Sequence, residues 1–152
     1  MRSTLINLRQ SAFRNCGALI NANIPNVQSI GDFAFYNCRS LSSVDFPVVT
    51  DIGSWAFQYC YGLDSVGLPS VVNIGEGCFR NCNSLRAINL PKCHYYRDNI
   101  FGGCGALTKA SFGTDATITD IKFQNSLFEG VITTNIDLII GVNVLPNPNG
   151  YS

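Results

Sequence analysis

The sequence contains little charge. Lys, Arg, Asp and Glu make up 13% of the 152 residues, which is half of the roughly 25% that is usual in globular domains. Ten basic and ten acidic residues cancel to a net charge of zero. This balance argues against nucleic acid as a partner, because such affinity comes mainly from Lys and Arg that neutralise phosphates. It also removes the polybasic route to a membrane surface.

Long apolar runs are missing as well. No segment approaches the ~20 consecutive apolar residues of a membrane-spanning helix, and the longest candidate, 136–144, contains Asp137, Gly141 and Asn143. The first residues lack the continuous apolar core of a signal peptide. No Asn-x-Ser/Thr sequon occurs. We therefore expect no membrane insertion, and the missing sequon favours a bacterial or viral source over a eukaryotic secreted one.

Groups suited to catalysis are few. The single histidine, His94, has no second histidine to join it as a metal ligand. Its neighbour Cys93 would point to the opposite face of an extended strand, so the two side chains cannot form a catalytic dyad there. The glycine-rich stretch 102–105 lacks the lysine and the spacing of a phosphate-binding loop. We predict that the protein is not an enzyme and uses no cofactor or metal.

What the sequence does contain is a repeat. Phenylalanine recurs every 22 residues (35 − 13 = 22), and cysteine, leucine and proline keep the same step. The recurring positions are Phe13, Phe35, Phe57, Phe79 and Phe101; Cys16, Cys38, Cys60, Cys82 and Cys104; Leu19, Leu41, Leu63, Leu85 and Leu107; and Pro25, Pro47, Pro69 and Pro91. This period lies in the ~20–29-residue range of leucine-rich repeats. Because each copy buries its apolar face against its neighbours, the pattern predicts a solenoid.

One copy, residues 41–62, indicates the structure of the repeat. Val44 and Phe46 alternate with polar residues, which is typical of a half-buried strand, and Pro47 ends this strand because it has no N–H for the ladder. A second short extended segment, 49–53, ends in a glycine turn. Residues 55–60 are predicted to form a helical or 3₁₀ turn that directs Ala, Phe and Cys inward.

Residues 41–91 follow the pattern LxxVxLPxxVxxIGxxAFxxCxx almost residue for residue. In this pattern the chain resembles the BspA-type leucine-rich repeat family, clearly over residues 5–112. The resemblance implies a right-handed solenoid, exposed on a cell or virion surface and used for adhesion or protein binding, with no catalytic residues. We expect about six coils, each with a short parallel β-strand and a short helical or 3₁₀ turn.

The whole chain, 1–152, is predicted to be a single solenoid domain. It divides into an incomplete first repeat (1–18), regular repeats (19–112), a degenerate terminal repeat (113–140) and an irregular tail (141–152) rich in Pro and Gly. The first repeat starts mid-copy without a polar cap. Such an end exposes apolar side chains and unpaired backbone, which invites association.

The seven cysteines allow three interpretations. Five belong to the repeat, and Cys78 and Cys93 replace Ala and Val at inward positions. Buried thiols that act as small hydrophobes are favoured. The alternatives are a disulfide, or a zinc site built from Cys78, Cys82, Cys93 and His94.

Three groups of residues are candidates for ligand binding. The first projects from the expected concave sheet and consists of small polar residues without the Trp, Tyr and Arg that usually anchor interfaces, so a contact there would be weak, hydrated or glycan-like. Its members are Asn21, Asn23, Ser43, Asp45, Ser65, Asn89 and Lys109. The second group is aromatic and consists of Phe33, Tyr36, Trp55, Tyr59 and Tyr61. These rings are either wedged between adjacent turns or form an exposed patch for a sugar or a protein.

The third group is His94, Tyr95 and Arg97, which break the repeat pattern and represent either drift of the repeat or a recognition patch. Our first hypothesis is a non-enzymatic binding or adhesion module of a bacterial surface or phage-associated protein. Its location would be extracellular, at the cell surface or on a virion. It would recognise a protein or glycan on a host or partner cell. The alternative is a structural or inhibitory domain that docks, or self-associates, through its uncapped N-terminal edge.

Overall fold

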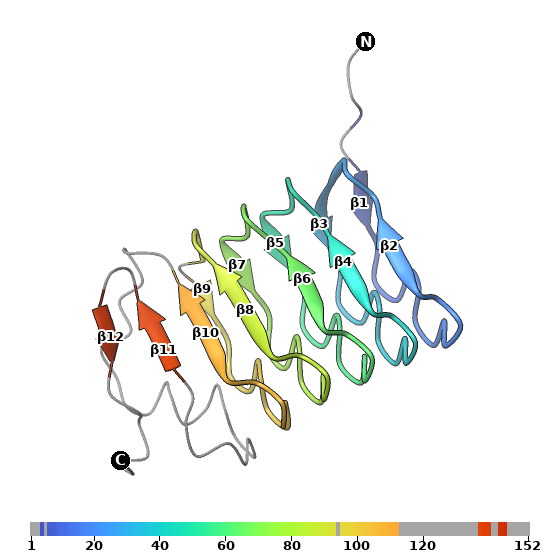
Figure 1. Ribbon diagram of the computed structural model, residues 1–152. Coiled ribbons are helices and arrows are strands. Elements are labelled where there is room, and N and C mark those ends of the chain that lie inside the picture. The colour runs from blue at the N-terminus through green and yellow to red at the C-terminus, as the bar shows by residue number, and fades with distance from the viewer. Residues whose placement is uncertain (1–3, 5, 94, 113–136, 141–142, 146–152) are drawn as a thin grey trace.

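Each regular coil of the chain contributes two short strands, which pair with strands of the neighbouring coils. The structure, a computed structural model, describes residues 4, 6–93, 95–112, 137–140 and 143–145. In Figure 1 the coils stack in a row, and their strands line up as a front sheet and a back sheet.

The back sheet is continuous, with the order β1-β3-β5-β7-β9 and parallel pairing. Its strands are β1 (Ile6–Leu8), β3 (Val27–Ile30), β5 (Asp51–Ile52), β7 (Asn73–Ile74) and β9 (Tyr95–Tyr96). In the register, Ile30 pairs with Ile52 and Ile52 with Ile74. One 22-residue repeat is therefore one complete coil, which confirms the predicted solenoid with a parallel strand in each repeat.

The front sheet consists of two hydrogen-bonded parts, β2-β4-β6 and β8-β10-β11-β12. Its strands are β2 (Asn21–Asn23), β4 (Ser43–Asp45), β6 (Ser65–Gly67), β8 (Ala87–Leu90), β10 (Lys109–Phe112), β11 (Asp137–Ile140) and β12 (Asn143–Leu145). Strands β6 and β8 are neighbours in Figure 1, but no backbone hydrogen bond joins these two strands. The ladder on this face is thus interrupted in the middle of the stack.

Most of the predicted terminal repeat, 113–136, lies outside the described residues. Its last residues, 137–140, form β11, which continues the parallel pairing with β10. Strand β12 then turns back and pairs antiparallel with β11. It falls within 141–152, where the sequence indicates an irregular tail.

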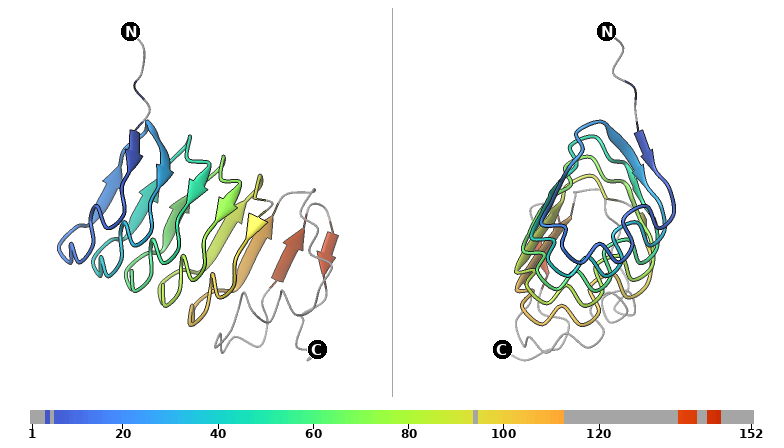
Figure 2. Two further views of the ribbon diagram at one scale, coloured as in Figure 1. Left: turned by 180° about the vertical axis from the view of Figure 1, so that it is seen from behind. Right: turned by 90° about the vertical axis from the view of Figure 1, so that its right-hand side faces the viewer.

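The core lies inside the coils, which superimpose when the stack is seen from its end (Figure 2). Its centre is a stack of the repeat phenylalanines, with ring centroids 5.1–5.9 Å apart and nearly parallel planes. Leucine, valine and isoleucine of the two sheets surround this stack and are buried. Each fully buried side chain of this kind stabilises the fold by about 1.5–3 kcal/mol.

The predicted helical or 3₁₀ turn is wrong, since the described part of the chain contains no helix. In residues 31–38 alternate N–H groups bond within the coil, as from Tyr36 to the Phe33 carbonyl at 3.1 Å. The N–H groups between them bond to the next coil, as from Phe35 to the Ala56 carbonyl at 2.8 Å. A helix would use all of these donors within one coil, whereas the solenoid needs half of them for stacking. The result is a run of β-turns.

Candidate functional site

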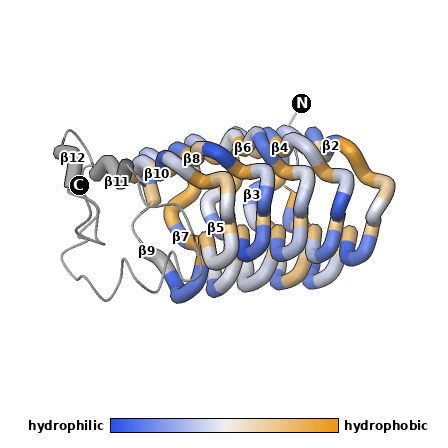
Figure 3. Tube along the Cα trace, turned by 60° about the horizontal axis from the view of Figure 1, so that its bottom comes forward, coloured by the Kyte–Doolittle hydropathy of each residue, from blue (hydrophilic) through white to orange (hydrophobic). Residues whose placement is uncertain are grey.

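The run of β-turns forms a third side of the stack, which we call the turn side: residues 9–16, 31–38, 53–60, 75–82 and 97–104. Figure 3, which brings the lower side of the molecule forward, shows hydrophilic and hydrophobic segments alternating along successive coils. Two positions in each coil have a positive φ, because alternate N–H groups must point to the next coil. The first position holds Ser11, Phe33, Trp55, Gly77 and Asn99, and the second holds Asn15, Asn37, Tyr59, Asn81 and Gly103.

Three aromatic residues occupy these left-handed positions. Phe33, Trp55 and Tyr59 have φ values of 57°, 54° and 63°. Left-handed backbone suits Gly and Asn, as most other coils have here, and it is unfavourable for bulky side chains. The three aromatic residues therefore lie at positions whose backbone conformation is unfavourable for bulky side chains.

These three residues and two more tyrosines form one surface cluster, the aromatic ridge: Phe33, Tyr36, Trp55, Tyr59 and Tyr61. Phe33 stacks on Trp55 with ring centroids 5.0 Å apart and on the edge of Tyr36 at 5.6 Å. Tyr36 contacts Tyr59 at 5.5 Å, and Tyr59 contacts Tyr61 at 5.9 Å. The structure thus brings the whole predicted aromatic group together. Tyr61 is exposed and the other four are half-buried.

The faces of the stacked rings are covered within the molecule. A Cβ atom on Gly77 would lie only 2.7 Å from Cδ1 of Trp55, so this glycine leaves room for the indole. At the other end of the stack, the guanidinium of Arg14 lies 5.3 Å from the centroid of Phe33 and 4.9 Å from that of Tyr36. The rings are wedged between coils, as in one of the two alternatives, but they are not fully buried.

Two arginines belong to the ridge, and sequence reasoning missed both. Besides Arg14, the guanidinium of Arg39 lies 5.8 Å from the centroid of Tyr61. Arg39 Nε donates to Oδ1 of Asn37 at 2.8 Å, and Asn37 Nδ2 donates to Oδ1 of Asn15 at 2.9 Å. Neither arginine forms an ion pair with any residue that the structure describes. A signal was present, because each arginine stands one repeat before the tyrosine that it covers (36 − 14 = 22; 61 − 39 = 22).

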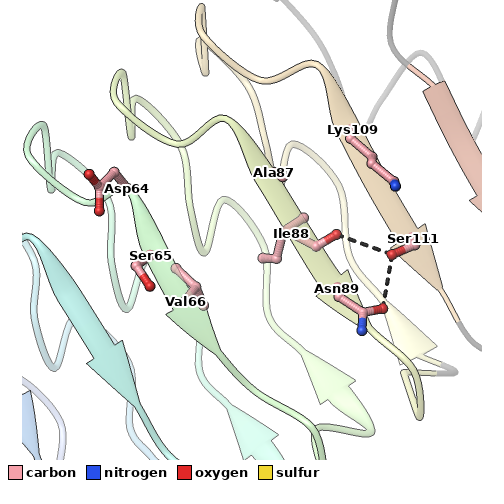
Figure 4. Close-up of a pocket in the computed structure, with 8 residues that line it drawn as sticks. All are labelled: Asp64, Ser65, Val66, Ala87, Ile88, Asn89, Lys109 and Ser111. Carbon is pink, nitrogen blue, oxygen red and sulfur yellow. Dashed lines mark hydrogen bonds between the residues drawn. The ribbon is translucent and has the colours of Figure 1, made fainter.

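The small polar group lies on the front sheet, on strands β2, β4, β6, β8 and β10. Hydrogen bonds run along it from coil to coil, from Ser43 Oγ to Asn21 Oδ1 at 3.1 Å and from Ser111 Oγ to Asn89 Oδ1 at 2.9 Å. Where the ladder is interrupted, a hollow of roughly 470 Å³ opens over β6, β8 and β10 (Figure 4). Its walls are mostly short side chains, with Lys109 at the rim.

The third predicted group is separate from the aromatic ridge. Tyr95 lies on β9 with 66% of its surface exposed, and Arg97 is exposed as well. Strand β9 is at the opposite end of the back sheet from β1. His94 lies outside the described residues.

All seven cysteines are free thiols. In the repeat cysteines from the second coil onward, Sγ donates to the carbonyl oxygen of a phenylalanine in the preceding coil. These bonds, 3.0–3.2 Å long, are Cys38 to Phe13, Cys60 to Phe35, Cys82 to Phe57 and Cys104 to Phe79. Burial raises the pKa of Cys38 to about 11 and that of Cys104 to about 12. Such protonated thiols are inert packing groups, and no cluster of metal-ligating residues occurs in the described ranges.

The fold defines a class: a parallel β-solenoid in which one repeat forms one coil. The BspA type leucine-rich repeat region, a family model with six copies, matches residues 6–135. The chain therefore belongs to this family.

Three solved structures are similar to the chain. A leucine-rich repeat protein from T. pallidum has a TM-score of 0.70 at 23% identity, over 90% of this chain and 68% of that one, and supports the fold alone. A leucine-rich cell surface protein from Faecalibacterium prausnitzii has a TM-score of 0.67 at 26% identity, over 82% of this chain and 32% of that one. A leucine-rich repeat protein from Bacteroides ovatus has a TM-score of 0.63 at 25% identity, over 73% and 36%.

The chain thus spans about a third of the length of the last two proteins. A comparison with curated proteins gave no match. Within the described residues, no helix is present that could cross a membrane.

Proposed function

We propose that the protein is a non-enzymatic binding or adhesion module of a bacterial surface or phage-associated protein, which recognises a protein or a glycan. Membership of the BspA type family and the similarity to a cell surface protein of F. prausnitzii support this function. Six of the seven free thiols in the described coils are buried, and Cys16 is exposed. Burial raises the pKa of Cys38, Cys60, Cys78, Cys82 and Cys104, which argues against reactive cysteines. Recognition by an extended surface is what a rigid stack of coils offers.

The observation that carries the proposal is the aromatic ridge on left-handed backbone. Each bulky residue in this conformation costs on the order of 1–3 kcal/mol. Gly77, Asn81 and Asn99 occupy equivalent positions without a large side chain, so stacking of the coils does not require aromatic residues there. Strain that the fold does not need is concentrated at functional sites, and exposed aromatic clusters are typical of interaction surfaces.

The test is binding to a glycan array and to extracellular-matrix proteins by the protein and by two variants, Trp55→Ala and Tyr61→Ala. We expect each variant to lose binding by about tenfold or more, as for an aromatic anchor of an interface. Val48→Ala is a matched control, because Val48 is 40% exposed and lies away from the ridge. Unchanged binding in both ridge variants would exclude the ridge as the site. Surface location is tested separately, by protease treatment of intact cells that carry the protein.

A second candidate function, docking or self-association through the N-terminal edge, is supported by the exposure of the first coil. Cys16 is exposed, whereas the equivalent cysteines of the later coils are buried. Ile20 is 59% exposed at a position where the next coils have Ser42 and Asp64. Cys16 and Ile20 thus give this coil an exposed apolar surface that a second copy or another partner can contact.

Light scattering over a range of concentrations tests this candidate. We expect dimers that dissociate in the variant Ile20→Asp, which introduces the residue that a later coil already has at this position. A monodisperse monomer whose N-terminal half resists proteolysis would contradict association through this edge.

A further inference from the structure

The aromatic ridge and its two arginines present a particular chemistry to a partner. We infer that the ridge, together with Arg14 and Arg39, docks an acidic segment of a protein. This inference rests on the proposed binding function and selects one class of ligand among those it allows.

The arrangement of the rings argues against a sugar. A sugar stacks on an open aromatic face, but the facing surfaces of Phe33 and Trp55 are packed against each other at 5.0 Å. The Trp55 indole also lies against Gly77, and Arg14 covers the outer side of Phe33. The half-buried rings therefore offer mainly their edges to solvent. Ring edges carry partial positive charge and favour contact with carbonyl and carboxylate oxygens.

The two guanidinium groups add full positive charges at the margins of the ridge. All three guanidinium–ring distances, 4.9, 5.3 and 5.8 Å, lie within the ~6 Å range of a cation–π interaction. Arg39 is also fixed through Nε by Asn37, so its terminal nitrogens keep their donors for an external acceptor. No described residue accepts a hydrogen bond from them. A guanidinium held in place matches a carboxylate with two parallel hydrogen bonds and loses little entropy on binding.

The nearby acidic groups leave these charges unneutralised. Asp32 is on the turn side, but its Oδ1 accepts a hydrogen bond from the N–H of Ser54 at 2.8 Å. Glu76 is exposed and forms no ion pair with either arginine. With a net charge of zero, the chain does not have the broad basic surface that a nucleic acid or another polyanion needs. A local site with Trp, Tyr and Arg has the composition of a protein-interface hot spot.

The experiment uses a random-peptide phage library selected on the intact chain. We expect the enriched peptides to be rich in Asp and Glu. The strongest peptide is then synthesised with a partner in which every Asp is Asn and every Glu is Gln, and affinities are measured by isothermal titration. The amide peptide is expected to bind about tenfold or more weakly, since hydrogen bonds between charged groups are lost.

Variants of the protein identify the arginines. The double variant R14Q/R39Q is expected to lose about tenfold or more in affinity for the acidic peptide. R39K keeps the charge but loses the planar fork, so it should bind with intermediate affinity. The matched control, R86Q/K92Q, removes two exposed positive charges outside the ridge and should bind as the unmodified protein does. Thermal unfolding of each variant checks that the fold is retained.

The inference is overturned if the selected peptides are not enriched in Asp and Glu, or if Trp55→Ala lowers the affinity of none of them. It is also overturned if the acid and amide peptides bind equally, or if R14Q/R39Q keeps full affinity for the acidic peptide. Binding that depends on Trp55 but not on the arginines or on acidic residues, including binding of a neutral glycan, sinks this inference and leaves the proposed function in place. The proposed function itself fails when the unmodified protein binds no protein and no glycan, whereas unchanged binding by the Trp55 and Tyr61 variants excludes only the ridge as the site.

Discussion

At the scale of single residues, a substitution of Tyr59 distinguishes a contribution to stability from a contribution to ligand binding. Tyr59 occupies a left-handed position whose neighbours in the same ladder are Asn37 and Asn81. Tyr59→Asn would relieve a strain of roughly 1–3 kcal/mol and lose ring contacts with Tyr36 and Tyr61 that are worth about 0.5–1.5 kcal/mol each. We therefore expect the free energy of unfolding to change by no more than about 1 kcal/mol, while ligand binding at the ridge weakens.

Denaturant unfolding of Tyr59→Asn beside Phe57→Ala provides the comparison. Phe57 is fully buried, and its truncation should cost about 3–5 kcal/mol. A loss of this size in Tyr59→Asn would show that the aromatic residue supports the fold, and would remove the argument from strain.

The buried thiols predict a dependence of stability on pH. Burial raises the pKa of Cys38 from 9.0 to about 11 and that of Cys104 to about 12, and it raises the pKa of Cys78 and Cys82 well above 9.0. The folded state thus holds these protons more tightly than the unfolded state. This stabilisation is complete below the unfolded pKa and is lost as the pH rises through the folded values. We expect the free energy of unfolding to fall steadily above pH 9.

Unfolding curves measured across this alkaline range test the expectation. The variant Cys38→Ala, which removes one such proton, should show a shallower fall. A stability that stays constant up to pH 11 would contradict the burial of protonated thiols. In the native protein at neutral pH, a thiol reagent should modify the exposed Cys16 first.

At the scale of the elements, the interruption between β6 and β8 predicts uneven protection of the front sheet. The N–H groups of Ala87 and Asn89 have no partner on β6, whereas in the next coil the N–H of Lys109 bonds to the Arg86 carbonyl at 3.3 Å. A missing hydrogen bond of about 1 kcal/mol corresponds to roughly a fivefold difference in an opening equilibrium. Amide exchange followed by NMR should therefore be about fivefold or more faster at Ala87 and Asn89 than at Lys109 and Ser111. Equal rates would mean that the front ladder is continuous in solution.

The elements also show where sequence patterns reach their limit. Alternation around Val44 and the stop at Pro47 predict strand β4, because side-chain direction in a strand follows directly from residue order. The same patterns suggest a helix at 55–60, since inward Ala, Phe and Cys at close spacing are common to a helix and to a run of turns. What decides between them is the direction of alternate N–H groups, which stacking of the coils fixes and which no single repeat encodes. The only local indication of turns was the presence of Asn37 and Gly77, because both residue types tolerate a positive φ.

At the scale of the whole molecule, the period of 22 residues makes the fold and much of the candidate site predictable. Side chains one period apart lie in adjacent coils, so Phe33 could be expected to meet Trp55. The same rule, applied to Arg14 with Tyr36 and to Arg39 with Tyr61, would have found both arginines. The distance between ring faces, the space above Gly77 and the break between β6 and β8 could not be predicted, because they depend on how neighbouring coils adjust to each other.

A stack in which each coil contacts only its neighbours should tolerate the removal of one complete coil. Deleting residues 83–104, which is 22 residues (104 − 83 + 1 = 22), joins Cys82 to Gly105 in the register of the repeat. The deletion keeps the aromatic ridge and Gly77 and brings β10 next to β6. We expect a folded protein with β-type circular dichroism, a lower melting temperature because one interface between coils is lost, and unchanged ligand binding at the ridge.

The control is deletion of half a coil, residues 94–104 (104 − 94 + 1 = 11). It places the apolar positions of one coil against the wrong positions of the next, and a shift of this kind moves buried side chains to the surface. This variant should aggregate or unfold. If both deletions unfold the chain equally, stability depends on contacts beyond neighbouring coils. If the whole-coil deletion folds but no longer binds, the site extends past the ridge toward β8 and β9.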